Sequence, residues 1–358
     1  MLPFLEQSDE AMLAWLAAHT APPYRLAQVR RWLFERRAAA FDEMSDLPKP
    51  LRRQLAEEFQ IWTASVAAHR RAADGTEKLL LELGDGERIE CVLLRDDRGH
   101  SAICISTQVG CAMHCAFCAS GIDGVVRNLA RGEILEQMLQ LQRLLRPEER
   151  LSHVVVMGMG EPLANLDRLL PALAQATASD GLGIGARRIT ISTVGLPEGV
   201  RRLAELNLQY HLAVSLHAAD DSLRNELVPA NRRVGVAAVI AAADEYFAKT
   251  GRRVTFEYVL LRGVNDAVEH ARQLVALLRG RPSLVNLILY NPVAGLPFRT
   301  PTAAAAKRFA AELVRGGLTV HVRRRKGERI DAACGQLRRD RAGEQENRGT
   351  GERQETGN

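Results

Sequence analysis

Residues 111–118 read Cys111-Ala-Met-His-Cys115-Ala-Phe-Cys118, so three of the six cysteines of the chain fall within eight residues. Three thiolates at this CxxxCxxC spacing can ligate three irons of a [4Fe–4S] cluster and leave the fourth iron open for a small molecule. A structural zinc site is the alternative, because zinc takes four close ligands and His114 lies inside the motif. The motif therefore predicts a metal centre, and it favours a cluster over zinc.

The rest of the composition is typical of a globular protein with a basic surface. The 358 residues carry a formal net charge of +5, which suits a polyanionic partner such as nucleic acid. Basic residues are paired or grouped at Arg30/Arg31, Arg36/Arg37, Arg187/Arg188, Arg232/Arg233, Arg252/Arg253 and Arg323 to Lys326. This length allows one large domain and a smaller one.

No targeting or membrane segment is predicted. The N-terminus lacks a basic region followed by an apolar run, and no stretch reaches the ~18 apolar residues that would span a membrane. We therefore expect a cytoplasmic protein without membrane attachment. Stable disulfides are rare in that compartment, so the cysteines are interpreted as ligands, reactive thiols or core residues.

Three segments flank the central part of the chain. Apolar residues at helical spacing predict a helical accessory domain over residues 1–72, where the arginine pairs of 30–37 are candidates for docking RNA. Two apolar runs around Gly84-Asp-Gly86 predict a β-hairpin linker over 73–99. Beyond residue 337 no apolar period remains, which predicts a disordered tail over 338–358.

Residues 100–337 alternate short β-rich runs with helical stretches, which predicts a parallel sheet that is either open or a full or partial barrel. The expected strands are 103–106, 154–158, 188–192, 211–216, 254–261, 285–290 and 319–322. The expected helices are 132–146, 166–178, 198–206, 221–229, 236–249, 267–279 and 302–315. Polar and glycine-rich residues follow the strand ends, where barrels place their chemistry.

Several residues outside the triad have two interpretations. Gly158-Met-Gly-Glu161 follows a predicted strand and is an ordinary turn or, beside an open iron, a clamp for the amino group of a bound amino-acid moiety. Cys104 and Cys334 are each more typical of small buried residues than of reactive thiols. Cys91 is interpreted as a core residue, and Glu90 as facing solvent from a strand.

Taken together, the motifs resemble those of a known family. The CxxxCxxC triad is accompanied by Gly158-Met-Gly-Glu-Pro-Leu163, Ser192-Thr193, Ser215-Leu-His217-Ala and Asp331-Ala-Ala-Cys-Gly-Gln-Leu337. This combination is similar to the radical S-adenosylmethionine (SAM) RNA methyltransferases that methylate adenine at C2 in 23S rRNA and tRNA. The likeness runs from about residue 24 to residue 337. It implies an α/β fold with a partial (β/α)6 radical SAM barrel, an N-terminal helical domain and a β-hairpin extension.

The resemblance also implies site roles. Cys111, Cys115 and Cys118 would hold one [4Fe–4S] cluster per chain, whose open iron binds SAM. The residues matching the family's SAM site are Gly160, Glu161, Ser192, Ser215, Leu216, His217 and Asn291. Cys334 would become S-methylated, Cys104 would form a transient disulfide with it, and Glu90 would accept a proton, although Cys91 stands where we expect threonine or a similar residue.

The implied chemistry suits adenine C2, which lies between two ring nitrogens and is not nucleophilic. One SAM would methylate Cys334, and a second would yield a 5′-deoxyadenosyl radical that takes hydrogen from the new methyl group. The resulting carbon radical would add to C2. After loss of the C2 proton, Cys104 would attack the Cys334 sulfur and release the methylated base, as in thiol–disulfide exchange.

The remaining expectations concern partners and alternatives. The resemblance implies 23S rRNA (at the peptidyl transferase centre) and tRNA (anticodon loops) as substrates, a flavodoxin- or ferredoxin-type electron donor and a monomer. Arg323 to Lys326 are the best candidates for phosphate contacts. Adenine-C8 methylation by the same machinery, a non-catalytic zinc-stabilised RNA-binding module and a radical enzyme for a small metabolite are the alternatives.

Overall fold

The computed structural model describes residues 1–96, 99–323, 327 and 330–338. Its centre is a ten-stranded sheet in the order β14-β13-β12-β11-β10-β9-β6-β5-β4-β3. The seven strands from β6 to β14 in this order are parallel to their neighbours. Within the described residues β14 and β3 are the two edges of the sheet, so the barrel is partial. The predicted partial α/β barrel is confirmed.

The parallel strands and their helices follow the predicted alternation closely. The strands are β6 (Ser101–Cys104), β9 (Leu151–Val156), β10 (Ile189–Thr193), β11 (His211–Ser215), β12 (Val254–Leu260), β13 (Ser283–Leu289) and β14 (Val320–Arg323). The helices are α4 (Arg131–Arg143), α5 (Leu166–Thr177), α6 (Pro197–Glu205), α7 (Asp221–Leu227), α8 (Asn231–Val234), α9 (Val236–Thr250), α10 (Val268–Leu278) and α11 (Ala303–Arg315). β12 is buried on both faces along most of its length, as is common for a central strand of a parallel sheet.

Three antiparallel strands extend the sheet beyond β6: β3 (Ser65–Arg71), β4 (Glu77–Glu82) and β5 (Arg88–Arg95). The hairpin of β4 and β5 confirms the prediction made from Gly84 and Gly86. The expectation of helix to about residue 70 is wrong over β3, whose side chains are exposed on both faces. No apolar face therefore marked it as a strand.

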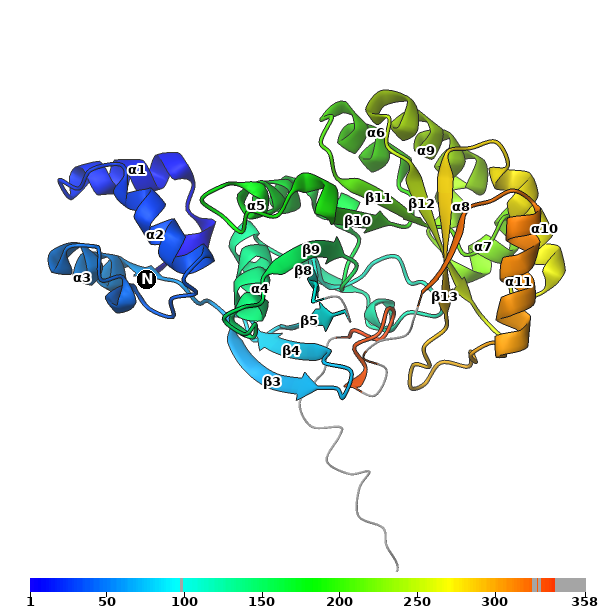
Figure 1. Ribbon diagram of the computed structural model, residues 1–358, viewed down its shortest axis with the longest axis horizontal. Helices are drawn as coiled ribbons and strands as arrows, with labels where there is room; N and C mark the ends of the chain where they lie inside the picture. The colour runs from blue at the N-terminus through cyan, green and yellow to red at the C-terminus, as the bar shows by residue number, and fades with distance from the viewer. Residues whose placement is uncertain (97–98, 324–326, 328–329, 339–358) are drawn as a thin grey trace, which may run out of the picture.

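The N-terminal helices form a small module at one end of the molecule, and α10 and α11 lie at the other end (Figure 1). The module consists of α1 (Asp9–Ala18), α2 (Arg25–Phe34) and α3 (Lys49–Glu58), with a short parallel pair of β1 (Leu2–Pro3) and β2 (Phe59–Gln60). Its core includes Phe4, whose ring meets Phe41 and Phe59 edge-on at 5.6 and 6.0 Å.

Polar contacts join this module to the barrel. The buried Glu136 carboxylate on α4 accepts hydrogen bonds from Thr63 N at 2.9 Å, Thr63 Oγ1 at 2.6 Å and Ala64 N at 2.9 Å. Arg37 donates to the carbonyl oxygens of Leu145, Arg146 and Glu149 at 2.8–3.2 Å. The module is thus bound to the loop after α4 as well as to α4 itself.

A second hairpin, β7 (Gln108–Gly110) with β8 (Val125–Asn128), encloses the triad and was not predicted. Gly110 has φ +78°, and a Cβ there would lie 1.9 Å from Gly124 O, so only glycine allows the two strands to close. Among the described residues, no helix combines the length and the apolar character needed to cross a membrane. The predicted tail beyond residue 338 lies outside the described residues.

Candidate active site

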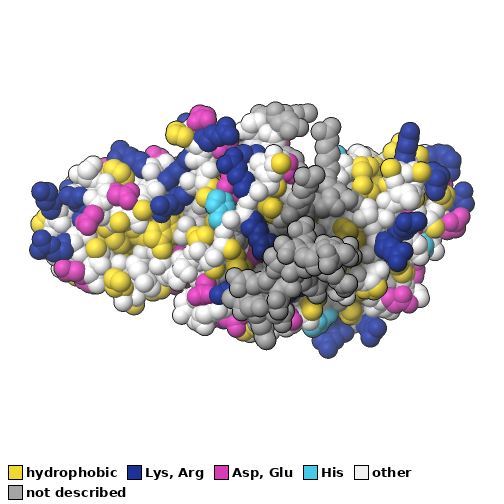
Figure 2. All heavy atoms as spheres, turned by 90° about the horizontal axis from the view of Figure 1, so that it is seen from below, with side chains coloured by type: hydrophobic (Ala, Val, Ile, Leu, Met, Phe, Trp, Pro, Cys, Tyr) yellow, Lys and Arg dark blue, Asp and Glu magenta, His cyan; other side chains and the backbone are white. Residues whose placement is uncertain are grey.

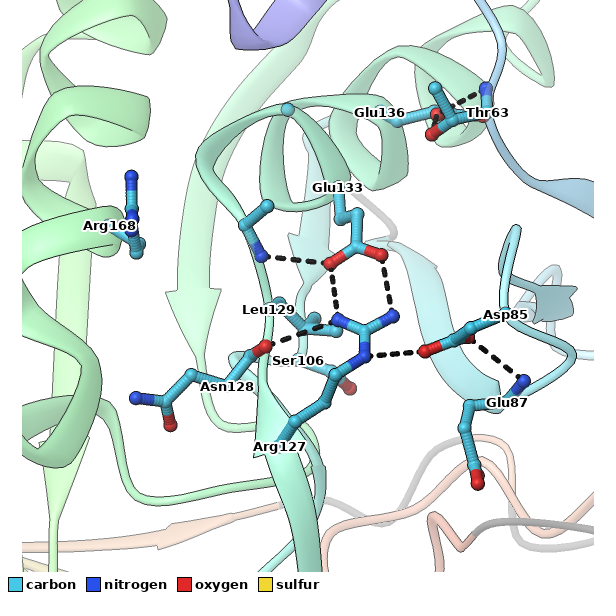
Figure 3. A network of polar contacts seen from close by, with 12 residues as sticks. Thr63, Asp85, Glu87, Ser106, Arg127, Asn128, Leu129, Glu133, Glu136 and Arg168 are labelled. Atoms are coloured by element: carbon cyan, nitrogen blue, oxygen red, sulfur yellow. Dashed lines mark hydrogen bonds and ion pairs between the residues drawn. The ribbon is translucent and has the colours of Figure 1, made fainter. Parts of the chain in front are cut away.

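The triad lies in the loop between β7 and β8, and this loop is held at both ends. Cys111 N donates to Gly124 O at 2.9 Å across the base of the loop. On β8, Arg127 donates to Asp85 in the β4–β5 turn at 2.6 Å and to both Glu133 oxygens on α4 at 2.8 Å (Figure 3). The hairpin is therefore anchored to the extension strands and to the first barrel helix.

The arrangement of the triad fits a cluster better than a single zinc ion. Among the residues that the structure describes, no three Cys, His, Asp or Glu side chains converge closely enough for one metal ion. A zinc ion needs its ligands around one point, whereas in a cluster each thiolate binds a different iron. His114, the candidate fourth zinc ligand, instead turns its Nδ1 toward Gly121 O at 2.9 Å.

The three thiols also need a cation to become ligands. Burial raises the pKa of Cys111 to about 12 and raises the pKa values of Cys115 and Cys118 as well. Only the thiolate binds a metal. Since burial disfavours a lone thiolate here, the loop suits a bound cationic centre that offsets the charge of three sulfurs.

A pocket of about 910 Å³, counted with its open mouth, lies against the triad. All three cysteines line it, together with residues from the carboxyl ends of β9, β10, β11 and β13. Six of the seven residues matched to the SAM site line it: Gly160, Glu161, Ser192, Ser215, His217 and Asn291. Leu216 is the exception, because it is fully buried in the core and is not part of the lining.

Glu161 is a buried carboxylate at the wall of this pocket. Its Oε1 accepts from Leu163 N at 3.0 Å, and its Oε2 accepts from Val194 N at 2.9 Å. Burial raises its pKa, while these hydrogen bonds act in the opposite direction. The two backbone donors fix the carboxylate in place and leave it able to accept further hydrogen bonds from an ammonium group.

His217 follows β11 with φ +61°, a left-handed conformation that is uncommon among residues other than glycine but that histidine adopts more often than most. Its Nδ1 accepts from Val259 N at 3.0 Å, so a neutral ring carries its proton on Nε2. Burial, and then the charge of Arg224, lower its pKa to about 3. The ring therefore stays neutral at physiological pH and can donate one hydrogen bond into the pocket.

Arg224 on α7 is a supporting residue that the sequence did not reveal. Its guanidinium is almost fully buried and donates to Leu216 O, Val194 O and Ser215 O at 3.0, 2.6 and 3.0 Å, and to the Asn231 side chain. It therefore ties together the loops that follow β10 and β11. A helical arginine surrounded by ordinary helix residues gives no sequence signal for this role.

Cys334 lies where two pockets meet. It lines the pocket of the triad, and it also lines a second pocket of about 670 Å³ together with Cys104 and Arg323. Its backbone is held nearby, because Asn291 Nδ2 donates to Cys334 O at 3.3 Å. The structure thus brings together the triad, Cys334 and Cys104, which lie up to 230 residues apart in the sequence.

All six cysteines are free thiols in this structure, so no bond joins Cys104 to Cys334. Burial raises the pKa of Cys104 to about 12, Cys334 acts in the same direction, and Arg323 acts against it. The guanidinium of Arg323 also contacts Met157 Sδ at 3.8 Å. Arg323 therefore faces the two thiols, which argues against its predicted role in phosphate contacts. Residues 324–326 of that basic run lie outside the described residues.

Glu90 and Cys91 lie on opposite faces of β5, and both are buried. Cys91 is fully buried, which confirms its place in the core. Glu90 is also buried, so the expectation of a solvent-facing carboxylate is wrong; it pairs with Lys78 Nζ at 2.6 Å. Glu90 does not line either pocket that contains Cys334, but a third pocket beside Arg338. Its role as a proton acceptor stays a prediction.

The predicted basic face of the N-terminal module is smaller than expected. Arg30 is half-buried between Asp9 and Asp180, with the Asp180 contact at 2.9 Å. Arg37 binds backbone carbonyls of the barrel. These two arginines hold the structure together, whereas Arg31 and Arg36 remain exposed.

Two family models match the chain. Residues 105–275 match the radical SAM superfamily, and residues 3–61 match the ribosomal RNA large subunit methyltransferase N-terminal domain. A crystal structure of a radical SAM methyltransferase from Sphaerobacter thermophilus has a TM-score of 0.91 and 41% identity, covering 94% of this chain and 99% of that one. Fold and site together define a radical SAM methyltransferase.

Relatives narrow this class further. A probable dual-specificity RNA methyltransferase RlmN of Rhodopirellula baltica is 59% identical over 337 residues, which cover 94% of this chain and 91% of the relative. A protein with the same description from Symbiobacterium thermophilum is 47% identical over 339 residues, with coverage of 94% and 91%. This chain belongs to the RlmN family of radical SAM dual-specificity RNA methyltransferases. Membership implies a [4Fe–4S] cluster and SAM as cofactors.

Proposed function

We propose that this protein methylates C2 of adenine in 23S rRNA and in tRNA anticodon loops, and that Cys334 carries the methyl carbon. The observation that supports this most directly is the position of Cys334 in the wall shared by the two pockets. One pocket contains the triad and the strand-end residues, and the other contains Cys104. A sulfur placed there can receive a methyl group on one side and deliver it on the other.

The triad would hold the cluster, and the strand-end residues would hold SAM. Glu161 would accept hydrogen bonds from the SAM ammonium group, His217 Nε2–H would donate one, and Ser192, Ser215 and Asn291 would complete the site. Bound together, the cluster and SAM supply a methyl group and a carbon-centred radical. The pocket walls position the reacting carbon and exclude water.

Protein side chains would perform the other steps. Cys334 sulfur holds the carbon that becomes bonded to C2, so protein and RNA are joined covalently at that stage. Addition of a carbon radical to C2 leaves one unpaired electron on the adduct, so the closed-shell ring returns when Glu90 takes the C2 proton and one electron passes back to the oxidised cluster. The Cys104 thiolate then attacks the Cys334 sulfur and the bond from that sulfur to the transferred carbon breaks. The carbon keeps the electron pair and takes up a proton to complete the methyl group, while the two sulfurs form a disulfide that an external reductant must reopen.

The RNA must present an unstacked adenine, because the half-buried Cys334 lines two pockets and a base stacked in a helix does not reach into a pocket. Flipping a base costs a few kcal/mol, and phosphate contacts would offset that cost. Lys and Arg side chains lie at both ends and near the middle of the face shown in Figure 2.

We further propose that residues 1–72 dock RNA and that residues 73–99 link this domain to the catalytic core of 100–337. A flavodoxin- or ferredoxin-type protein donates the electron, and the enzyme is a cytoplasmic monomer.

The test is mass spectrometry of RNA treated with the reduced, cluster-loaded enzyme. Modified adenosine should co-elute with the C2-methyl standard, whereas co-elution with the C8-methyl standard would assign the alternative regiochemistry. Cys334→Ala should form no protein–RNA adduct, and Cys104→Ala should accumulate it. Free methylated RNA in normal yield from Cys104→Ala would contradict the roles of the two cysteines.

A further inference from the structure

The segment that carries Cys334 makes hydrogen bonds to two different parts of the molecule, the cluster loop and the extension strands. Towards the cluster loop, Ala119 N donates to Gly335 O at 2.8 Å, and Ser120 Oγ donates to Leu337 O at 2.6 Å. Towards the extension strands, the hydrogen bonds within the described part of the chain come from one pair of buried side chains, Lys78 on β4 and Glu90 on β5. Residues 331–338 therefore bridge the cluster loop and the antiparallel hairpin, as the orange-red segment in Figure 1 indicates.

The Lys78–Glu90 pair contacts this segment at two points. Lys78 Nζ donates to Asp331 O at 3.0 Å, three residues before Cys334. Glu90 Oε2 accepts from Arg338 N at 2.9 Å, four residues after it. Between them, Lys78 Nζ and Glu90 Oε1 lie 2.6 Å apart. The ion pair therefore closes a ring of contacts around the reactive cysteine.

Because the ion pair in this ring is buried, losing either partner should be costly. Lys78 is 6% exposed and Glu90 is 4% exposed, and removing one partner of a buried ion pair leaves an uncompensated charge. Among the residues that the structure describes, Arg70, Asp331 and Arg338 are the other charged groups that line the same pocket. An ion pair that also holds two backbone groups is a stiff connection, because each contact is assisted by charge.

We propose that Lys78 is a positioning residue for the methyl transfer, acting through Glu90 and the backbone of residues 331–338 to hold the Cys334 sulfur between its two pockets. The inference rests on the proposed role of Cys334.

Two readouts test this without RNA, on the cluster-loaded enzyme. The first is hydrogen–deuterium exchange of the peptide spanning residues 330–338, and the second is the rate at which Cys334 acquires a methyl group from SAM, followed by mass spectrometry. In Lys78→Met we expect exchange to accelerate about tenfold and methylation to slow by about the same factor, as for the loss of one charge-assisted hydrogen bond. Lys78→Arg should recover most of both.

Matched variants separate positioning from general destabilisation. Lys249→Met removes an exposed ion pair with Glu205 on α9 and α6 and should change neither readout. Lys78→Met combined with Glu90→Gln leaves no buried charge and keeps an acceptor for Arg338 N, so it remains folded if the single variant does not. This double variant should still show faster exchange near Asp331, where the lysine contact is lost.

The outcomes are distinguishable. Unchanged exchange and unchanged Cys334 methylation in the Lys78 variants would overturn the inference, and so would slower methylation without faster exchange. If the wild-type enzyme transferred no methyl group to Cys334, the proposed function would fail, while the exchange data would still decide whether Lys78 holds the segment.

Discussion

Cys104 illustrates how one residue's environment constrains the timing of the reaction. It is buried on β6 in the pocket that also contains Cys334 and Arg323. Burial raises its pKa to about 12, although Arg323 opposes that effect. The thiolate is the attacking form, so this cysteine is kept almost entirely protonated near neutral pH. An early attack on the Cys334 sulfur, before the carbon has reached the RNA, is thereby disfavoured.

We expect resolution of the covalent adduct to accelerate with pH. Since the pKa of Cys104 lies far above neutrality, each added pH unit between about 7 and 9 should increase the thiolate fraction, and the rate, about tenfold. Isolated adduct transferred to buffers of different pH, then quenched and resolved on a denaturing gel, gives this rate. A rate independent of pH would show that another step limits release.

Arg323→Met should slow the same step, because it removes the cation that favours the Cys104 thiolate. We expect about a tenfold loss at neutral pH, equivalent to a pKa shift of one unit. Arg188, a surface arginine just before β10, offers a control as Arg188→Met. Equal adduct lifetimes in both variants would remove Arg323 from this role.

The affinity for SAM should not change with pH through protonation of His217. Its pKa is lowered to about 3 by burial, so the ring remains neutral from pH 5.5 to 8. Calorimetric titration with SAM over that range should show no break near pH 6.5 that depends on His217. His217→Ala should bind SAM about tenfold more weakly through loss of one hydrogen bond.

The same shift carries a stability consequence whose sign is clear. The unfolded chain protonates this histidine below about pH 6.5, whereas the folded chain does so only near pH 3. Stability should therefore be complete above about pH 6.5 and decrease as pH falls from there toward 3. Denaturant unfolding of wild type and His217→Gln should show a shallower decrease in the variant.

At the scale of elements, the sequence predicted the barrel strands within a few residues because each is a short β-rich run between helical patterns. It failed for β3, which exposes both faces, and for β7–β8, whose strands of three and four residues are held by tertiary contacts. The triad was recognisable from spacing alone. Lys78 and Arg224 were not, because their partners are backbone groups and side chains brought together only by folding.

The β7–β8 hairpin leads to a prediction of its own. Arg127→Met should remove the ion pairs that anchor it to Asp85 and Glu133, and the cluster loop should become more mobile. Because Arg127 is about one-third exposed, the global loss in stability should be only on the order of 1 kcal/mol. Iron and sulfide should nevertheless be released faster in air. Arg201→Met, which breaks an exposed pair with Glu245, should retain the cluster normally.

At the scale of the whole molecule, the charge distribution predicts salt-dependent binding to RNA. Affinity should fall steeply with salt concentration, as expected when Lys and Arg displace counterions from phosphates. Arg31→Ala should weaken binding of all RNAs alike and reduce the salt slope by about 1. Arg30→Ala should instead lower stability, because its guanidinium is engaged by Asp9 and Asp180. Filter binding at several salt concentrations and thermal unfolding separate the two effects.

The docking of the N-terminal module has one further consequence. Glu136 of the barrel accepts from backbone groups that follow the module, and Arg37 of the module donates to backbone carbonyls of the barrel, so the module is fixed at two separate points and its distance from Cys334 is set by the fold. A module fixed in this way keeps a constant distance between the RNA that it contacts and the reactive cysteine. An RNA bound to the module can place in the site only a base that lies at this distance from the bound region. The three-dimensional shape of the RNA, more than its nucleotide sequence, would therefore decide which adenines the protein accepts.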